Sequence, residues 1–422
     1  MKRCASESLA LVSLGCAKNA VDLQVRAGDL LKAGCTLSPD PDRADTVIVN
    51  TCAFIASARE EAEAEIRRAL ELKHRGNFRR VVVTGCYPQR YPKAVAKFPG
   101  VDEWIGVPQE WTEPKIPALR FTGKAFAYLK IAEGCAHRCS YCAIPAIRGK
   151  YRSRPSAAVL KEAKALLASG CRELVVVAQD PMLWHEKKTG KDGGELRLTD
   201  LLWKLDKLPG DFWIRVLYSY PSEIDEDYVV WLMTAEHAVK YVDVPLQHTV
   251  PAILEKMNRR RAIDASLSVA ETLRALIPDV TLRTTIMTGF PGETEHRFNV
   301  MRSDLRRMQF DHLGAFAYSP EEGTKGALMK GRPSRAVAEE RERIVMEDAE
   351  RLWKVRAKRL IGRVFRALVV APGVARMESQ APDVDGVTYL LCGRGEASPD
   401  VGEFVNVKLT KVKGFDFIGE VV

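Results

Sequence analysis

Three cysteines within eight residues are the strongest chemical feature of this sequence. Cys135, Cys139 and Cys142 stand in the run CAHRCSYC, directly after a predicted strand at Ala127–Ala132. Three thiolates this close in one loop can hold three irons of a cubane cluster, and the fourth iron then keeps a coordination position open for a substrate. The spacing therefore predicts a redox-active 4Fe-4S cluster.

Two other interpretations of this loop compete with the cluster. A structural zinc site usually takes four ligands in two pairs, and the sequence shows no second pair beside the loop. Buried structural cysteines are the other interpretation, but three of them beside Gly134, His137 and Arg138 are not typical of a core. Both comparisons favour the cluster.

Three further cysteines, Cys16, Cys52 and Cys86, each follow a short apolar run. The runs are Leu9–Leu14, Thr46–Val49 and Val81–Val83, and the stretches Asp22–Ala33 and Ser57–Lys73 between them are rich in helix-forming residues. Alternating strands and helices predict a parallel sheet, whose strands end at one edge, so the three cysteines can converge there. Lone cysteines are also commonly buried as hydrophobic residues, and spacing alone leaves both readings open.

A second alternating segment predicts six strand and helix units. The predicted strands are Ala127–Ala132, Glu173–Ala178, Trp213–Tyr218, Tyr241–Val244, Thr281–Met287 and Leu313–Tyr318. Six units are fewer than the eight that close a full barrel, so we expect an open, partial β/α barrel with its site at the carboxyl edge of the strands. A charged helix at Arg335–Leu360 is expected to lead out of it.

The chain after Gly362 changes to short β-rich runs broken by proline and glycine. These runs are Val364–Val370, Val387–Leu391, Phe404–Leu409 and Phe417–Val422. They predict a small all-β barrel. The predicted fold class is thus α/β with a terminal β-barrel, in three domains at residues 6–118, 121–355 and 358–422.

Composition narrows the classes of protein to consider. No apolar run is long enough to cross a bilayer, and Met1–Ala10 lacks the apolar core of a signal peptide, so we expect a cytoplasmic protein without a membrane partner. Ten cysteines in 422 residues argue against a disulfide scaffold. The net charge of +9 permits an anionic partner such as RNA or the ribosome, but does not establish one.

The cysteine loop, with Tyr141 before its last cysteine, resembles the cluster loop of the radical S-adenosylmethionine superfamily. The resemblance implies that Cys135, Cys139 and Cys142 have a catalytic role, with the open iron binding the amino and carboxylate groups of S-adenosylmethionine. An electron from the cluster then cleaves this cofactor to a 5′-deoxyadenosyl radical. Such a radical removes hydrogen from unactivated C–H bonds, for which acid–base side chains are too weak.

The amino-terminal cysteines extend the resemblance to one family. The motifs SLGCAKN at Ser13–Asn19, NTC at Asn50–Cys52 and TGC at Thr84–Cys86, followed by the cluster loop, resemble the methylthiotransferase family. In that family these three cysteines carry a second 4Fe-4S cluster, and the terminal β segment resembles its TRAM domain. The resemblance covers nearly the whole chain and implies two clusters and S-adenosylmethionine as cofactors.

Other motifs resemble the branch of the family that modifies a ribosomal protein. They are IAEGC (Ile131–Cys135), AIPAIRGKYRSRP (Ala143–Pro155), VPLQH (Val244–His248), YSPEEGT (Tyr318–Thr324) and APDVDG (Ala381–Gly386). This branch implies methylthiolation of an aspartate β-carbon in a small-subunit ribosomal protein at the decoding centre, with an electron donor as a further partner. The sequence departs from the branch at Ala17, where proline is usual, and at Gln24, where an acidic residue is expected.

Two alternatives remain beside this prediction. The first is the same chemistry on an adenosine of tRNA, which the basic net charge suits. The second is a non-catalytic iron-sulfur or zinc protein that binds RNA. The segment from Arg356 to Val422 carries ten basic and eight acidic residues and is nearly balanced, which weakens the RNA reading there. We therefore expect four of its acidic residues to suit a basic protein partner: Asp383, Asp385, Asp400 and Glu403.

By the same resemblance, seven residues lie around S-adenosylmethionine. They are Gln179, Asp180, Gln247, His248, Gly289, Gly292 and Glu293. The last three belong to a loop, Thr288–Glu293, that also reads as a plain tight turn before a helix.

The remaining candidates have structural readings. A run of basic residues that often forms only a solvated face comprises Arg148, Lys150, Arg152 and Arg154. Four cysteines have no partner at ligand spacing and are read as structural or incidental: Cys4, Cys35, Cys171 and Cys392.

Overall fold

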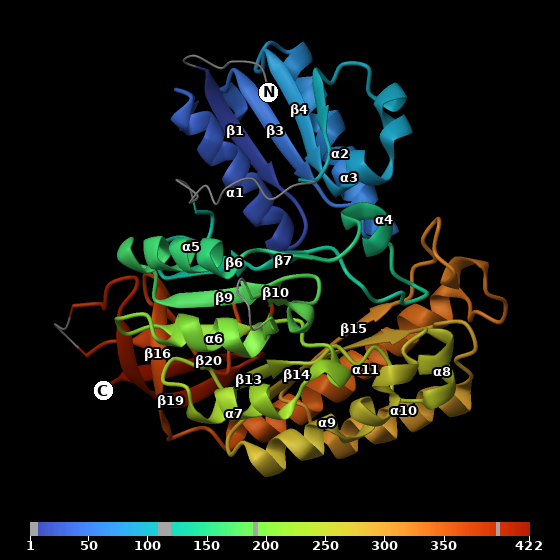
Figure 1. Ribbon diagram of the computed structural model, residues 1–422, viewed down its shortest axis with the longest axis vertical. Helices are drawn as coiled ribbons and strands as arrows, with labels where there is room; N and C mark the ends of the chain where they lie inside the picture. The colour runs from blue at the N-terminus through green and yellow to red at the C-terminus, as the bar shows by residue number, and fades with distance from the viewer. Residues whose placement is uncertain (1–6, 109–119, 189–192, 394–396) are drawn as a thin grey trace. The chain divides into compact units, whose positions relative to one another are not determined.

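The computed structural model describes residues 7–108, 120–188, 193–393 and 397–422 (Figure 1). The chain forms two compact units. The first contains the chain up to Phe121 together with Lys130–Arg138 and Cys142–Glu162. The second contains Thr122–Leu129, Cys139–Tyr141 and the chain from Ala163 onward. Cys4 and the predicted domain limits at residues 6 and 118 lie outside the described residues.

The first unit is built on a five-stranded parallel sheet of order β2-β1-β3-β4-β5. Its strands are β1 (Ser8–Ser13), β2 (Thr36–Leu37), β3 (Thr46–Thr51), β4 (Arg80–Gly85) and β5 (Glu103–Ile105). Its first three helices are α1 (Ala17–Lys32), α2 (Ala56–His74) and α3 (Cys86–Arg90), and α4 (Ile144–Arg148) joins them from later in the chain.

Successive residues of a strand point to opposite faces of the sheet. Both faces of this sheet are apolar, and helices cover both of them. Leu23 of α1 packs with Ile48 of β3 in one buried cluster. Ile66 of α2 packs with Val47 and Val49, the neighbours of Ile48 along β3, in another. The continuous apolar runs of the strands follow from this double burial, and the predicted parallel sheet is confirmed.

The six predicted barrel strands are present and lie in chain order. They are β6 (Phe126–Lys130), β9 (Glu173–Val177), β12 (Trp213–Val216), β13 (Tyr241–Asp243), β14 (Thr281–Thr288) and β15 (His312–Ala317). Hydrogen bonds join them as β12-β9-β6 and β13-β14-β15, and a parallel bridge between Ile214 and Ala238 links the two groups. The pairings described by register are parallel, and the open, partial barrel predicted from the sequence is confirmed.

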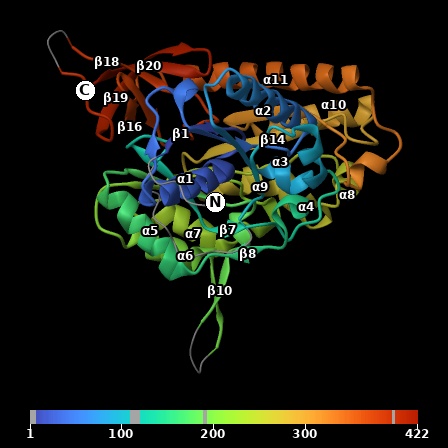
Figure 2. The same cartoon turned by 90° about the horizontal axis from the view of Figure 1, so that it is seen from above.

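Helices and short strands follow the barrel strands. The helices are α5 (Ser156–Ala168), α6 (Leu198–Asp206), α7 (Glu226–Thr234), α8 (Pro251–Lys256), α9 (Ile263–Leu276), α10 (Glu295–Met308) and α11 (Arg335–Lys358). Figure 2 shows the hairpin of β10 (His185–Lys187) and β11 (Glu195–Arg197), which the sequence patterns did not predict. The long α11 packs against β14 and β15. Within the described residues, none of the helices has both the length and the apolar character needed to cross a bilayer.

The end of the chain is a closed, five-stranded barrel of order β16-β17-β18-β20-β19. The strands are β16 (Val364–Ala371), β17 (Val374–Met377), β18 (Thr388–Leu391), β19 (Phe404–Lys413) and β20 (Asp416–Val421). The predicted small barrel is confirmed, but the sequence patterns missed β17. Arg376 interrupts the apolar pattern of that strand, yet its side chain is buried because it pairs with Glu173.

Candidate functional site

The structure brings Cys16, Cys52 and Cys86 to one edge of the sheet in the first unit. Each cysteine follows the carboxyl end of one of three adjacent parallel strands, β1, β3 and β4. Gly15 has a φ of +89°, and a Cβ at this position would lie 2.8 Å from the Cβ of Cys52. Glycine is therefore required where the chain before Cys16 passes Cys52. The three cysteines thus follow adjacent strand ends, as the strand pattern predicts, and their binding of one cluster stays a prediction.

Two asparagines from the cysteine motifs tie these loops together. The Nδ2 of Asn19 donates to the carbonyl oxygens of Leu14 at 2.8 Å and Thr51 at 3.2 Å. The Nδ2 of Asn50 donates in turn to the carbonyl oxygen of Asn19 at 2.9 Å. Both asparagines are buried, so the loops that carry Cys16 and Cys52 are held by satisfied hydrogen bonds.

Burial governs the protonation of this cysteine group. Burial raises the pKa of Cys86 to about 12, although the positive charge of Arg148 opposes the shift. Burial also raises the pKa of Cys52. The thiols of Cys52 and Cys86 are thus protonated at neutral pH in the metal-free protein, and a metal that binds them as thiolates displaces their protons.

A buried charge network stands next to Cys86. The Nη2 of Arg148 donates to Cys86 Sγ at 3.2 Å, and Nη1 of Arg148 donates to Asp22 and Glu133. The ammonium group of Lys130 donates to the same two carboxylates. Asp22, Lys130, Glu133 and Arg148 are all buried.

The solvated-face interpretation of the basic run is wrong for two of its members. Arg148 belongs to the buried network, and Arg154 is buried against Glu162 at 2.6 Å. These side chains can be buried because each guanidinium meets a carboxylate. Lys150 is exposed and Arg152 is partly exposed.

The loop with the three-cysteine motif contributes to both units, and each part has its own support. In the first unit, Cys142 Sγ accepts the N–H of Ile144 at 3.4 Å. A Cβ on Gly134, which has a φ of +77°, would lie 2.3 Å from the carbonyl oxygen of Lys150, so glycine is required directly before Cys135. Cys135, Cys139 and Cys142 are all partly exposed.

In the second unit, a buried arginine stands beside Cys139. Nη1 of Arg259 lies 4.0 Å from Cys139 Sγ and 3.4 Å from the hydroxyl of Tyr141. The guanidinium stacks on the ring of Tyr220, 4.2 Å from its centroid. A fixed positive charge beside Cys139 offsets the negative charge that a metal-bound thiolate carries. The sequence patterns did not indicate Arg259.

The aromatic residue before the last cysteine is anchored in the core of the second unit. The ring of Tyr141 meets Phe290 edge to face at 6.4 Å, and Phe290 meets Tyr318 in the same way at 5.0 Å. Met287 and Met257 belong to the same apolar cluster. This packing excludes water on one side of the segment that carries Cys139.

The predicted cofactor loop after β14 is a tight turn fixed by protein contacts. A Cβ on Gly289 would lie 2.2 Å from the Cβ of Ala338, and one on Gly292 would lie 2.5 Å from Lys256 Nζ. The N–H of Gly289 donates to Glu293 Oε1, which also accepts from Arg341 at 2.8 Å. Packing thus accounts for Gly289, a φ of +93° accounts for Gly292, and hydrogen bonds account for Oε1 of Glu293. Their contact with S-adenosylmethionine stays a prediction.

Gln247 and His248 lie at the carboxyl side of β13 and pair with the end of β14. The N–H of Val250 donates to Nδ1 of His248 at 3.0 Å, and Nε2 of His248 lies 3.3 Å from Glu293 Oε2. Gln247 is buried with a φ of +69°. Among the described residues, its Oε1 has no hydrogen-bond partner.

The side chain of Gln247 supplies a test of fit for the predicted cofactor. A buried acceptor without a partner costs free energy unless a ligand or water donates to it. The amino group of S-adenosylmethionine is such a donor, so this residue fits the predicted site. Asp180, the residue after Gln179, is buried as well. Its Oδ1 accepts the N–H of Met182 at 3.1 Å.

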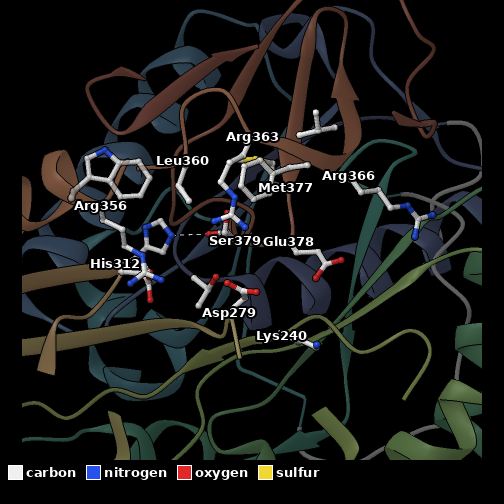
Figure 3. Close-up of a pocket in the computed structure, with 15 residues that line it drawn as sticks. Lys240, Asp279, His312, Arg356, Leu360, Arg363, Arg366, Met377, Glu378 and Ser379 are labelled. Atoms are coloured by element: carbon white, nitrogen blue, oxygen red, sulfur yellow. Dashed lines mark hydrogen bonds and ion pairs between the residues drawn. The ribbon is translucent and has the colours of Figure 1, made fainter. Parts of the chain in front are cut away.

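A cavity of about 340 Å³ lies at the opposite edge of the barrel strands (Figure 3). Lys240, Thr281 and His312 line it at the amino ends of β13, β14 and β15. His312 Nε2 is hydrogen-bonded to the carbonyl oxygen of Ser379 at 2.7 Å, as the dashed line in Figure 3 marks. The predicted site residues do not line this cavity. Residues of the barrel strands and of the terminal barrel line it together, so we infer that the terminal barrel packs against this edge.

Two of the four acidic residues expected to suit a basic partner, Asp383 and Asp385, make hydrogen bonds within the second unit, although Asp383 is exposed. Asp385 accepts a hydrogen bond from the hydroxyl of Tyr241 at 2.6 Å and lies 3.5 Å from Arg283. Asp383 accepts one from the hydroxyl of Tyr128 at 2.5 Å. Both carboxylates thus bind groups on the barrel strands. The other two acidic residues, Asp400 and Glu403, are exposed.

Comparisons with known proteins place this arrangement in a family. Residues 8–106 match the model of the Uncharacterized protein family UPF0004, residues 129–305 match the Radical SAM superfamily, and residues 361–422 match the TRAM domain. The "Ribosomal protein uS12 methylthiotransferase RimO" of Moorella thermoacetica is 39% identical over 98% of this chain and 99% of its own length. The chain belongs to the RimO family.

Other RimO proteins match over the same extent. That of Syntrophus aciditrophicus is 37% identical over 98% of both chains, and that of Acetivibrio thermocellus is 36% identical over 99% of this chain and 98% of its own. Among solved structures, the radical S-adenosylmethionine methyltransferase TsrM from Kitasatospora setae superposes with a TM-score of 0.56. It covers 76% of this chain and 77% of its own at 17% identity, a likeness of fold alone.

Proposed function

We propose that this RimO-family protein adds a methylthio group to the β-carbon of an aspartate in the small-subunit ribosomal protein uS12. One observation carries the proposal. The chain that contains the Cys135, Cys139 and Cys142 loop also brings Cys16, Cys52 and Cys86 to one edge of a separate parallel sheet. Full-length relatives named as uS12 methylthiotransferases support the choice of substrate.

The cysteines of the loop would hold the first 4Fe-4S cluster, and their surroundings suit it. When bound, this cluster supplies the electron that cleaves S-adenosylmethionine to a 5′-deoxyadenosyl radical. The buried guanidinium of Arg259 offsets negative charge at Cys139. Tyr141 and Phe290 shield the same segment from water. The unpartnered Oε1 of Gln247 would accept from the cofactor amino group.

The turn after β14 would shape the cofactor site. Glu293 Oε1 accepts from Arg341 and from the N–H of Gly289, so this oxygen is bound within the protein. His248 Nε2 lies 3.3 Å from Glu293 Oε2, and among the described residues neither atom has a hydrogen-bond partner. We therefore assign Glu293 Oε1 to holding the turn in place.

Cys16, Cys52 and Cys86 would hold the second cluster, whose site supplies the sulfur. The overall reaction replaces one C–H bond at the aspartate β-carbon with a C–S bond that carries a methyl group. The hydrogen leaves with the 5′-deoxyadenosyl group, and a second S-adenosylmethionine supplies the methyl group. An electron donor and the small ribosomal subunit are the further partners that we propose.

Anaerobic reconstitution tests this assignment. Two cubane clusters require about eight irons for each chain, and a functional first cluster releases 5′-deoxyadenosine when reductant and S-adenosylmethionine are added. A protein that binds zinc in place of iron, or that binds iron without releasing 5′-deoxyadenosine, contradicts the proposal. The second result would favour a binding protein over an enzyme.

A further inference from the structure

We propose that Arg148 is a positioning residue for the second cluster. This arginine fixes Cys86 as a ligand and raises the reduction potential of that cluster. The inference rests on the proposed function, since it takes Cys16, Cys52 and Cys86 as the ligands. It concerns a residue that follows both cysteine groups in the sequence, six positions after Cys142.

The guanidinium of Arg148 reaches the cysteine group directly. Its Nη2 donates to Cys86 Sγ at 3.2 Å and to Asn19 Oδ1 at 3.2 Å. Asn19 in turn ties together the loops that carry Cys16 and Cys52. One planar group thus contacts a candidate ligand and the residue that braces the other two.

The buried network prevents the guanidinium from turning away. Its Nη1 is bound by Asp22 and Glu133, which are also bound by Lys130. The two carboxylates and the two cations balance, and the four side chains are between 1% and 7% exposed. A balanced network in a dry interior is strong only while every member stays in place.

A hydrogen bond from a cation to a ligand sulfur has a definite effect on an iron-sulfur cluster. Reduction adds negative charge, and a nearby guanidinium stabilises the more negative state. The potential of the cluster is therefore higher with Arg148 than without it. The same bond holds Cys86 in the orientation of a ligand, as partners of metal ligands generally do.

The network also flanks the loop of the first cluster. Lys130 ends β6, and Glu133 stands two residues before Cys135. Arg148 closes the same segment on its other side, after Cys142. Three of the four residues that hold Cys86 therefore belong to the chain segment that carries the first cluster.

The test uses full-length protein in which Cys135, Cys139 and Cys142 are replaced by alanine, so that only the second cluster forms. Its midpoint potential is measured by redox titration followed by electron paramagnetic resonance. Iron loss to a chelator gives a second readout. The variants are Arg148→Gln and Arg148→Lys, and the control is Arg80→Gln, since Arg80 begins β4 at the amino edge of the same sheet and pairs with Glu103 at 3.1 Å.

We expect Arg148→Gln to shift the midpoint potential to a more negative value and to speed iron loss several-fold. Arg148→Lys should shift it less, because a cation remains, and Arg80→Gln should match the parent. Asp22→Asn and Glu133→Gln weaken the contacts that hold the guanidinium but leave Arg148 in place. They should shift the midpoint potential by an intermediate amount. These two variants keep the test decisive if Arg148→Gln fails to fold.

Unchanged potential and iron loss in folded Arg148→Gln, or in both network variants, would overturn the inference. Failure of the proposed function gives a different result. In that case the parent protein with Cys16, Cys52 and Cys86 intact binds no cluster, and the inference falls with it.

Discussion

The hydroxyl of Tyr241 donates a hydrogen bond of 2.6 Å to the carboxylate of Asp385. Tyr241 begins β13, whereas Asp385 lies between β17 and β18 of the terminal barrel. The same carboxylate accepts the N–H of Ala381 and lies near Arg283 and His312. The terminal barrel is therefore fixed to the amino edge of the radical S-adenosylmethionine barrel by a buried acid.

Replacing Asp385 with alanine should destabilise the second unit. The side chain is 2% exposed, and its loss leaves the Tyr241 hydroxyl and the Arg283 guanidinium without this acceptor. Breaking a buried charged contact costs roughly 3 to 5 kcal/mol. Urea unfolding measures the change. The exposed Asp400→Asn is the matched control and should change stability by less than about 0.5 kcal/mol. Equal stability of Asp385→Ala and the parent would contradict the docking role.

Gly289→Ala should be destabilising, and Ala338→Gly should partly rescue it. The added Cβ meets Ala338 at 2.2 Å, and Gly289 has a φ of +75°. The clash and the backbone strain together cost roughly 2 to 5 kcal/mol. Removing the Ala338 methyl group relieves the clash but leaves the strain. The free energies of unfolding of the two single variants and the double variant give the coupling between the two positions. Purely additive changes would show that the contact with Ala338 is not the reason why position 289 requires glycine.

The rate at which Cys86 is alkylated in the metal-free protein should rise strongly with pH. The thiolate is the reactive form, and the pKa of Cys86 is raised to about 12 by burial. Below that value the thiolate fraction rises about tenfold for each pH unit, so the rate should climb without a plateau from about pH 7 to about pH 10. Peptide mapping after timed alkylation measures the rate. A plateau below about pH 9 would show that the interior around Cys86 is not as dry as the structure indicates.

Alanine variants of the two cysteine groups should separate two activities. Cys139→Ala should abolish release of 5′-deoxyadenosine, because a cubane without one thiolate cannot keep its open iron in place. Cys52→Ala should retain that release and lose methylthio transfer. Chromatography of the nucleoside and mass spectrometry of the substrate distinguish the two losses. Cys35→Ala, at a buried cysteine away from both motifs, is the control and should retain both activities.

The sequence predicted β1, β3, β4 and the six barrel strands because each depends on a local pattern. Apolar runs mark β3 and β4, and the positions of Cys52 and Cys86 follow from the strand ends. The order of the six barrel strands followed from their alternation with helices. These features need no knowledge of distant residues.

The buried charges could not be predicted in the same way. Arg148 and Asp22 are 126 positions apart, and Arg259 and Cys139 are 120 apart. A charged side chain is normally exposed, and only its partner allows burial, so a local pattern places Arg148 on the surface. The contacts of Asp385 could not be predicted for the same reason, because Tyr241 and Arg283 lie far from it in sequence.

The most direct test of the central claim is mass spectrometry of the modified substrate. The reconstituted protein is incubated anaerobically with S-adenosylmethionine, a reductant, and both small ribosomal subunits and tRNA. We predict that one methylthio group replaces one hydrogen on an aspartate peptide of uS12, with release of 5′-deoxyadenosine and with unmodified tRNA. Methylthio-adenosine in the tRNA, without a mass increase on the uS12 peptide, would contradict the account.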